Sequence, residues 1–273
     1  IVNVIGNPPW DRMKLQEVEW FAERRPEIAL QARAADRKRL IAALEKNNDP
    51  LWLDYRHAAE RADTMARVAR ASGHYPLLSG GDINLYSLFV ERASRLVRQH
   101  GIVGLLTPSG IAGDLGAAKF FRSISISGRL GALLDFENRK TFFPDVHASL
   151  KFCAMVFGGP QRRFDAARCA FYLHSVDQLQ APERLIPLDA ADFAAVNPNT
   201  GTAPIFRSRR DAEITTRIYR THPVLIDRSA EQEDPPGPVR VVWPVRYCTM
   251  FHMTSASGLF RTTAWLQEQG GYR

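Results

Sequence analysis

The chain has 273 residues, of which 45% are hydrophobic and 24% are charged, so it can bury a sizeable core in one large or two smaller domains. Its net charge of +7 favours a polyanionic partner, and nucleic acid is the simplest choice. No apolar stretch is long enough to cross a bilayer and no signal peptide opens the chain, so we expect no membrane partner.

The three cysteines, Cys153, Cys169 and Cys248, are far apart and form no Cys-x-x-Cys pair. This spacing disfavours both a disulfide framework and a zinc site, so we expect reduced thiols in a cytoplasmic protein. The chain begins without Met inside what reads as a strand, and we expect it to be an excerpt of a longer protein.

The first distinctive segment is a β-branched strand, residues 2–6, followed by the turn Asn7-Pro8-Pro9-Trp10. Two prolines remove backbone donors and fix φ, so they end the strand and stiffen the turn. We expect the Asn7 amide, the Pro8 carbonyl and the Trp10 ring at the carboxyl end of the strand. Ligands bind at that position in open α/β sheets.

The Asn7-Pro8 pair offers two hydrogen-bond acceptors side by side. They can hold both hydrogens of a planar amine and localise its lone pair for attack, while Trp10 stacks on the attached ring. Beside an electrophilic methyl donor, this geometry predicts transfer of a methyl group to an amine. The simpler interpretation is a strand-ending loop in which Trp10 only packs.

Helix-forming residues dominate from about residue 11 to residue 79. We expect helices over 27–46 and 51–71, which together form a helical insertion. The arginines of this segment are balanced by acids, which favours a solvated surface. The alternative is a DNA-facing role for the basic run Arg33, Arg37, Lys38 and Arg39.

The next segments alternate between helix and strand. We expect helices over 85–99 and 116–126 and buried strands over 102–106, 130–136 and 149–157. Leu85, Leu88, Phe89 and Leu96 are expected to form the apolar stripe of the first helix. The last two strands follow each other without a helix, which predicts an antiparallel hairpin at the end of a parallel α/β sheet.

After residue 160 the composition changes, and proline-rich and polar stretches become frequent. One more strand is expected within 164–175, and a short basic helix over 209–220. The remainder reads as an irregular linker and the beginning of a second module.

Four motifs stand in a characteristic order along residues 1–160: Ile5-Gly6-Asn7-Pro8-Pro9-Trp10, Gly81-Asp82-Ile83-Asn84-Leu85-Tyr86-Ser87-Leu88-Phe89, Leu105-Leu106-Thr107-Pro108-Ser109-Gly110 and Phe143-Pro144-Asp145-Val146. In this order they resemble the adenine-N6 DNA methyltransferases of bacterial restriction-modification and phage-defence systems, in particular the Eco57I-like methylases. The resemblance implies the carboxyl-terminal half of a Rossmann-like class I methyltransferase sheet. It also implies a bacterial cytoplasmic location.

The resemblance assigns a role to each matched residue. Asn7 and Pro8, with Pro9 completing the turn, would bind the N6 amino group of an adenine flipped out of double-stranded DNA, and Trp10 would stack on that base. Phe143 would be a second aromatic wall. On the next motif, Leu85 and Phe89 lie one helical turn apart and would line the adenine end of S-adenosyl-L-methionine. Without the resemblance, Leu85, Phe89 and Phe143 read as packing residues.

The glycine-rich cofactor motif of this family lies upstream of the Asn-Pro-Pro turn, and this chain does not contain it. We therefore expect residues 1–160 to be a partial catalytic domain, inactive alone, and 161–273 to be a linker and the start of a DNA target-recognition region. The resemblance further implies that nuclease or helicase subunits can be fused to such a protein or associated with it.

Two other functions fit the same turn. Protein glutamine N5-methyltransferases also carry an Asn-Pro-Pro-aromatic turn, and a catalytically silent DNA-binding module would need no cofactor. Near the proposed pocket, Asp135 and Glu137 read as solvated loop acids rather than a metal site. Arg139 and Lys140 read either as phosphate contacts or as plain surface residues.

Overall fold

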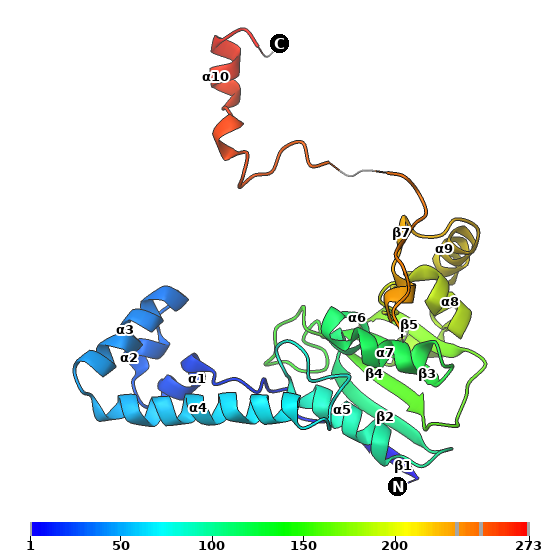
Figure 1. Cartoon of the computed structure of the whole chain (residues 1–273), viewed down its shortest axis with the longest axis horizontal. Helices are drawn as coiled ribbons and strands as arrows, with labels where there is room; N and C mark the ends of the chain where they lie inside the picture. The colour runs from blue at the N-terminus through cyan, green and yellow to red at the C-terminus, as the bar shows by residue number, and fades with distance from the viewer. Residues whose placement is uncertain (1, 233–234, 246–247, 272–273) are drawn as a thin grey trace.

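A computed structural model describes residues 2–232, 235–245 and 248–271, and Figure 1 shows the arrangement of the elements. Its centre is a six-stranded sheet with the strand order β1-β2-β4-β3-β5-β6. The strands are β1 (Asn3–Gly6), β2 (Ile102–Pro108), β3 (Leu130–Glu137), β4 (Lys151–Gly158), β5 (Ala167–Leu173) and β6 (Ile186–Leu188).

The strand directions confirm the predicted α/β class with an antiparallel member. β1 is parallel to β2 and β3 is parallel to β5, whereas β4 runs antiparallel to both β2 and β3. The prediction that this hairpin ends the sheet was wrong, because β4 is inserted between β2 and β3 and the sheet continues into β5 and β6. β4 is apolar on both faces, which suits a central strand.

This topology places the carboxyl ends of β1, β2, β3 and β5 at one edge of the sheet, together with the start of β4. We call this edge the carboxyl edge. Residues that follow β1 and β3 therefore meet there although more than 100 positions separate them in sequence. The division at residue 160 stays a prediction; the sheet itself runs past it to residue 188.

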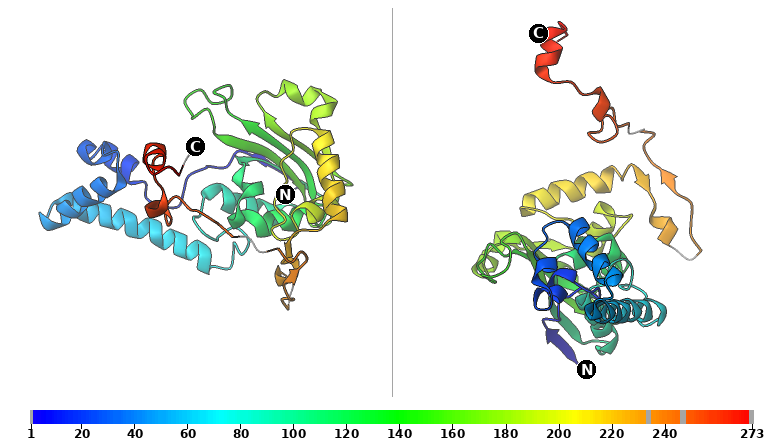
Figure 2. Two further views of the ribbon diagram at one scale, coloured as in Figure 1. Left: turned by 90° about the horizontal axis from the view of Figure 1, so that it is seen from above. Right: turned by 90° about the vertical axis from the view of Figure 1, so that its left-hand side faces the viewer.

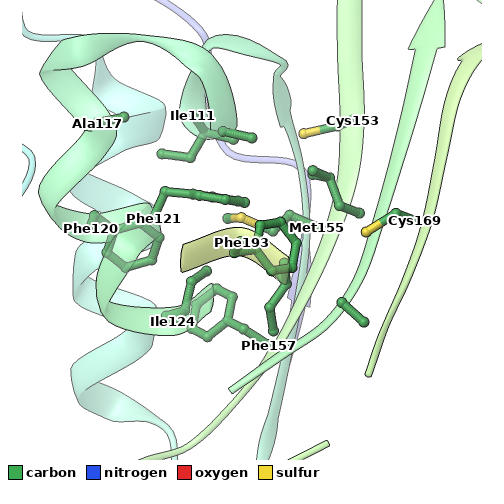
Figure 3. Packing of buried hydrophobic residues seen from close by; sticks show 14 of the residues in the cluster. Ile111, Ala117, Phe120, Phe121, Ile124, Cys153, Met155, Phe157, Cys169 and Phe193 are labelled. Atoms are coloured by element: carbon green, nitrogen blue, oxygen red, sulfur yellow. The ribbon is translucent and has the colours of Figure 1, made fainter. Parts of the chain in front are cut away.

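One face of the sheet is covered by α5 (Leu85–Leu96), α6 (Gly110–Gly113), η1 (Leu115–Ala117), α7 (Ala118–Ser125) and α8 (Ala190–Val196). Figure 3 shows Phe120 and Phe121 of α7 and Phe193 of α8 packed toward Met155 and Phe157 of β4. All five side chains are at most 1% exposed, so this interface is the main core.

The buried side of α5 differs from the expected stripe. Leu88 is buried as predicted, in a cluster with Ala66, Ala69 and Ile83. Phe89 and Leu96, in contrast, are 51% and 41% exposed, and the residues that face the main core are Tyr86, Val90 and Ala93. These three positions also follow helical spacing, at i, i+4 and i+7, so the amphipathic pattern alone allowed either register.

The opposite face of the sheet is covered mainly near the carboxyl edge. There, Phe136 and Phe152 stack with ring centroids 5.3 Å apart, and the rings of Phe142 and Phe143 pack against Phe152. Farther from this edge, residues of β1, β2 and β4 line a largely apolar cavity of about 550 Å3. β1 forms one edge of the sheet.

The helical insertion forms an arm that projects from the sheet domain (Figures 1 and 2). It contains α1 (Glu17–Ala22), α2 (Pro26–Ala29), α3 (Ala34–Lys46) and α4 (Pro50–Ala71). The single helix expected over 27–46 is broken between α2 and α3. This break lets both helices pack on α1, so that Phe21, Ile28, Ile41 and Leu44 share a small separate core.

The remaining elements follow the sheet. The short helices η2 (Asp177–Gln180) and η3 (Pro182–Arg184) connect β5 to β6, and the basic helix α9 (Arg209–Thr221) contacts α8. Beyond it lie β7 (Ile226–Asp227), η4 (Ser229–Gln232), β8 (Arg240–Val241), η5 (Ser257–Leu259) and α10 (Thr263–Glu268). Figure 1 shows α10 far from the sheet. In the described part of the chain, no helix is long and apolar enough to cross a membrane.

Candidate active site

The Asn7-Pro8-Pro9-Trp10 turn leaves the sheet at its carboxyl edge, directly after β1. Asn7 and Pro9 are exposed, Pro8 is buried and Trp10 is half-buried. The chain then pairs with the start of α5: the Leu85 amide donates to the Asp11 carbonyl at 2.8 Å, and the Met13 amide donates to the Ile83 carbonyl at 2.9 Å. The turn is therefore fixed at both ends, with the Asn7 side chain free to meet a ligand.

Trp10 and Phe143 are in edge-to-face contact with each other, and the role of Phe143 as a second aromatic wall stays a prediction. Their ring centroids are 6.2 Å apart with planes at 74°, and Phe152 lies 6.2 Å from Trp10 on the sheet. The indole Nε1 of Trp10 is buried, and no acceptor within the described residues reaches it. Packing and base contact are thus both open to Trp10, and its role stays a prediction.

The loop that carries Phe143 is organised by Asn138, a residue that sequence reasoning missed. The Asn138 side chain is fully buried; its Nδ2 donates to the carbonyls of Phe143 at 2.8 Å, Val146 at 3.1 Å and His147 at 3.3 Å. Its Oδ1 accepts from the Phe143 amide at 2.9 Å. One amide side chain therefore sets the position of the aromatic wall. We call residues 138–150 the Asn138 loop.

A weak signal for this arrangement was present in the sequence. Asn138 follows a strand and precedes Arg139 and Lys140, which both adopt positive φ, at 43° and 62°. An Asn at a strand end commonly bonds neighbouring backbone groups and so replaces the hydrogen bonds that such a turn lacks. The length and shape of the loop were not readable from this pattern.

Leu85 begins α5 beside the segment that follows the Asn-Pro-Pro turn, and Phe89 lies one helical turn farther along α5. Leu85 is partly buried and, together with Trp10, lines a cavity of about 690 Å3 that extends to α1 and α4 of the arm. Phe89 is half exposed, which is unusual for a large aromatic side chain on a packed helix. The prediction that Leu85 and Phe89 line the adenine end of S-adenosyl-L-methionine stays a prediction.

A buried carboxylate fixes the segment that precedes α5. Glu91 is 2% exposed and accepts from the Leu78 amide at 2.8 Å and from the Leu77 amide at 3.2 Å. The guanidinium of Arg95, one turn along α5, lies 3.6 Å from Oε1 of Glu91, the oxygen that also accepts from the Leu77 amide. Sequence reasoning did not identify Glu91, because an acid in an Arg-rich helix reads as a surface residue.

The two acids of β3 have different environments. The prediction of a solvated loop was wrong for Asp135, which is 5% exposed within the strand and accepts a hydrogen bond from the Ser109 hydroxyl. Burial raises the pKa of Asp135, although Ser109 and the charge of Lys151 oppose the change. Glu137, near the strand end, pairs with Arg139 at 3.1 Å and with His174 at 3.2 Å. Within the described ranges, no group of three or more His, Cys, Asp or Glu side chains could hold a metal ion.

No protein-family model matches this chain, and no curated protein matches it. Among solved structures, the cryo-EM structure of a DrdV–DNA complex is similar at 12% identity and a TM-score of 0.34, covering 66% of this chain and 16% of that one. The ATP-dependent Type ISP restriction-modification enzyme LlaBIII bound to DNA is similar at 10% identity and 0.32, covering 63% and 10%.

A putative class I S-adenosylmethionine-dependent methyltransferase from Listeria monocytogenes is similar at 14% identity and a TM-score of 0.29, covering 37% of this chain and 31% of that one. The chain therefore spans less than a third of each of these three chains. All three TM-scores lie below 0.5, so the α/β class follows from the strand order and not from these likenesses.

Proposed function

We propose that this chain forms the substrate-binding half of an S-adenosyl-L-methionine-dependent methyltransferase that modifies the N6 amino group of adenine in DNA. The observation that carries the proposal is the meeting of Asn7, Pro8, Trp10 and Phe143 at the carboxyl edge of an α/β sheet. Asn7 and Pro8 come from the end of β1, and Phe143 comes from the Asn138 loop after β3.

The chemistry follows from the groups that this turn presents. The Asn7 Oδ1 and the Pro8 carbonyl oxygen accept the two hydrogens of the amine, which makes the nitrogen lone pair available at right angles to the base. The cofactor, when bound, supplies an electrophilic methyl group. Trp10 stacks on the base and holds it in the plane that this geometry requires, and Phe143 supports the indole ring by edge-to-face contact. Positioning of this kind accounts for a large share of rate enhancement in bimolecular transfers.

The base must leave the duplex before it can reach this turn. A flipped base loses its stacking in the helix, and aromatic contact recovers about 1–3 kcal/mol per base. A pair of aromatic side chains beside the acceptors fits a nucleobase better than a glutamine side chain, which has no ring to stack. The paired aromatics and the net charge of +7 therefore favour DNA over a protein substrate. We place the protein in a bacterial restriction-modification or phage-defence system.

The experiment that tests this proposal identifies the methylated product. Isotope-labelled S-adenosylmethionine is incubated with duplex DNA, with an added protein substrate, and with either this chain or the full translation product of its gene. We expect N6-methyladenine from the full product and none from this chain alone. Label in a protein glutamine would favour the glutamine methyltransferase. Absence of any transfer would favour a silent DNA-binding module.

A further inference from the structure

A third cavity, of about 510 Å3, opens at the carboxyl edge of the sheet, and cationic side chains line it. Arg139 follows β3, Lys151 begins β4, and Arg184 and Arg207 come from segments beyond β5. Tyr172, near the end of β5, lies between them. We call this cavity the Tyr172 pocket.

The backbone at Tyr172 departs from a regular strand. Tyr172 has a φ of 55°, in a region that non-glycine residues rarely adopt, and the pairing of β5 with β3 is irregular at this point. The Arg184 guanidinium donates to the carbonyls of Phe171 at 3.0 Å and Tyr172 at 3.1 Å, which stabilises the irregular segment. The chain thus maintains a strained conformation that turns the Tyr172 ring into the pocket, as strain at functional sites often does.

The cations of the pocket are held mainly by groups without charge. The Lys151 Nζ lies 4.8 Å and the Arg207 Cζ 5.5 Å from the centroid of the Tyr172 ring, and Arg184 bonds backbone carbonyls. Glu137 is the one acid in the described lining of the pocket, and it pairs with Arg139. Partial burial opposes its ionisation, but His174 and Arg139 hold the pKa of Glu137 below its ordinary value. Four permanent cations therefore face one carboxylate.

An excess of cations at the mouth of an open cavity attracts an anion, and a guanidinium fork matches the oxygens of a phosphate group. The Tyr172 ring already makes cation–π contacts with Lys151 and Arg207 and packs against the core, so little of its surface is left for a nucleobase. These features fit the phosphodiester backbone of a nucleic acid better than a free nucleotide, which would need a place for its base.

The pocket is connected to the candidate active site through the Asn138 loop. Arg139 reaches the pocket from one end of this loop, and Phe143 contacts Trp10 from its middle. The Asn138 side chain bonds the Phe143 backbone and lies next to Arg139, so the start and the middle of the loop are held as one unit. A phosphate bound by Arg139 would therefore fix the aromatic wall at the same time.

We propose that the Tyr172 pocket binds a backbone phosphate of the DNA whose base is presented to Asn7 and Pro8. The identity of the nucleic acid rests on the proposed function above, whereas the anion site rests on the pocket itself. Such a contact positions the duplex without reading its sequence. Lys151 and Arg207 are both exposed, and unlike Arg139 neither is paired with the Glu137 carboxylate of the pocket.

The test is the salt dependence of DNA binding, measured by fluorescence anisotropy with a labelled duplex for this chain and for Lys151→Gln/Arg207→Gln. Each phosphate contact contributes about 0.9 to the slope of log K against log salt concentration, so the slope should fall by about 0.9 if the two cations share a phosphate and by about 1.8 if they do not. The matched control is Arg92→Gln/Arg98→Gln, which removes the same charge from exposed positions on α5 and just beyond it.

We expect the control to retain the slope of the unaltered chain, and Lys151→Gln/Arg207→Lys to fall between the two because it keeps one of the charges. Thermal denaturation of each variant checks that the fold is intact. An unchanged slope in Lys151→Gln/Arg207→Gln, an equal loss in the control, or no DNA binding by the unaltered chain would overturn the proposal. So would displacement of DNA by inorganic phosphate at matched ionic strength, because free phosphate would then be the ligand.

This assay separates the pocket from the proposed function. It measures binding and needs no methyl transfer, so it succeeds or fails independently of the cofactor. A chain that binds DNA through the pocket but forms no N6-methyladenine in the full protein would contradict the proposed function alone. A full protein that forms N6-methyladenine with an unchanged salt slope in the variant would contradict the pocket alone.

Discussion

Replacement of Asn138 by Ala tests whether one buried amide holds the aromatic wall in place. The side chain makes four hydrogen bonds to the Asn138 loop, and three of them are 3.1 Å or shorter. A typical intramolecular hydrogen bond contributes about 0.5–1.5 kcal/mol net, so loss of the three short bonds should lower the free energy of opening of the loop by roughly 1.5–4.5 kcal/mol. The Phe143 amide should then exchange with solvent about one to three orders of magnitude faster.

Hydrogen exchange followed by mass spectrometry measures this effect directly on residues 139–150. The core strands β2 and β4 should keep their protection, because the partners of Asn138 among the described residues, from Thr141 to Leu150, lie within its own loop. Asn47→Ala is the matched control: it removes an amide side chain at the end of α3 in the arm, where it should leave the Asn138 loop unchanged. If the Phe143 amide of Asn138→Ala exchanges as slowly as in the unaltered chain, the reasoning is refuted.

Three further predictions concern the aromatic wall, a buried acid and the thiols. Trp10→Ala in the full protein should reduce kcat/KM for DNA by about 5- to 150-fold, the equivalent of about 1–3 kcal/mol of stacking, whereas Trp10→Phe should reduce it only slightly. Steady-state kinetics measures both variants, and an equally low kcat/KM for the two would contradict a stacking role. The pKa of Asp135 is raised in the folded chain, so the folded state loses stability as the pH rises through that pKa and the carboxyl ionises. Asp135→Asn should therefore be more stable than the unaltered chain at pH 7 but not at pH 3. Urea titrations measure both values, and an equal effect of the substitution at the two pH values would contradict the prediction. Burial raises the pKa of Cys153 and Cys169 to about 12, whereas Cys248 is exposed. Iodoacetamide at pH 8 should therefore label Cys248 alone in the folded chain. Rapid labelling of either buried thiol would count against the fold.

The strands and helices of the sheet were largely readable from the sequence, because their burial follows simple periods. The five expected strands are all present, and the apolar character of residues 152–157 on both faces agrees with a central strand. The order of the strands was not readable. The position of β4 between β2 and β3 depends on contacts between residues distant in sequence, because the second strand of a hairpin can pair on either side of the first.

The candidate site was readable only in its local motifs. The Asn7-Pro8-Pro9-Trp10 turn can be predicted from the sequence because consecutive prolines permit few backbone conformations. Asn138 and Asp135 were missed or misread because their importance comes from burial among residues distant in sequence. Phe89 was placed on the apolar stripe of its helix because a large apolar residue at helical spacing usually packs, and only the register of α5 on the sheet shows that it is exposed.

The most direct test of the account removes the Asn7 amide. In the full protein, Asn7→Ala should abolish formation of N6-methyladenine while DNA affinity and its salt slope stay near those of the unaltered protein, because Asn7 is assigned to the amine and not to the backbone. Asn7→Asp keeps an acceptor oxygen and should retain part of the activity, and Asn47→Ala should retain all of it. Undiminished methylation by Asn7→Ala would contradict the central claim that this turn holds the methyl acceptor.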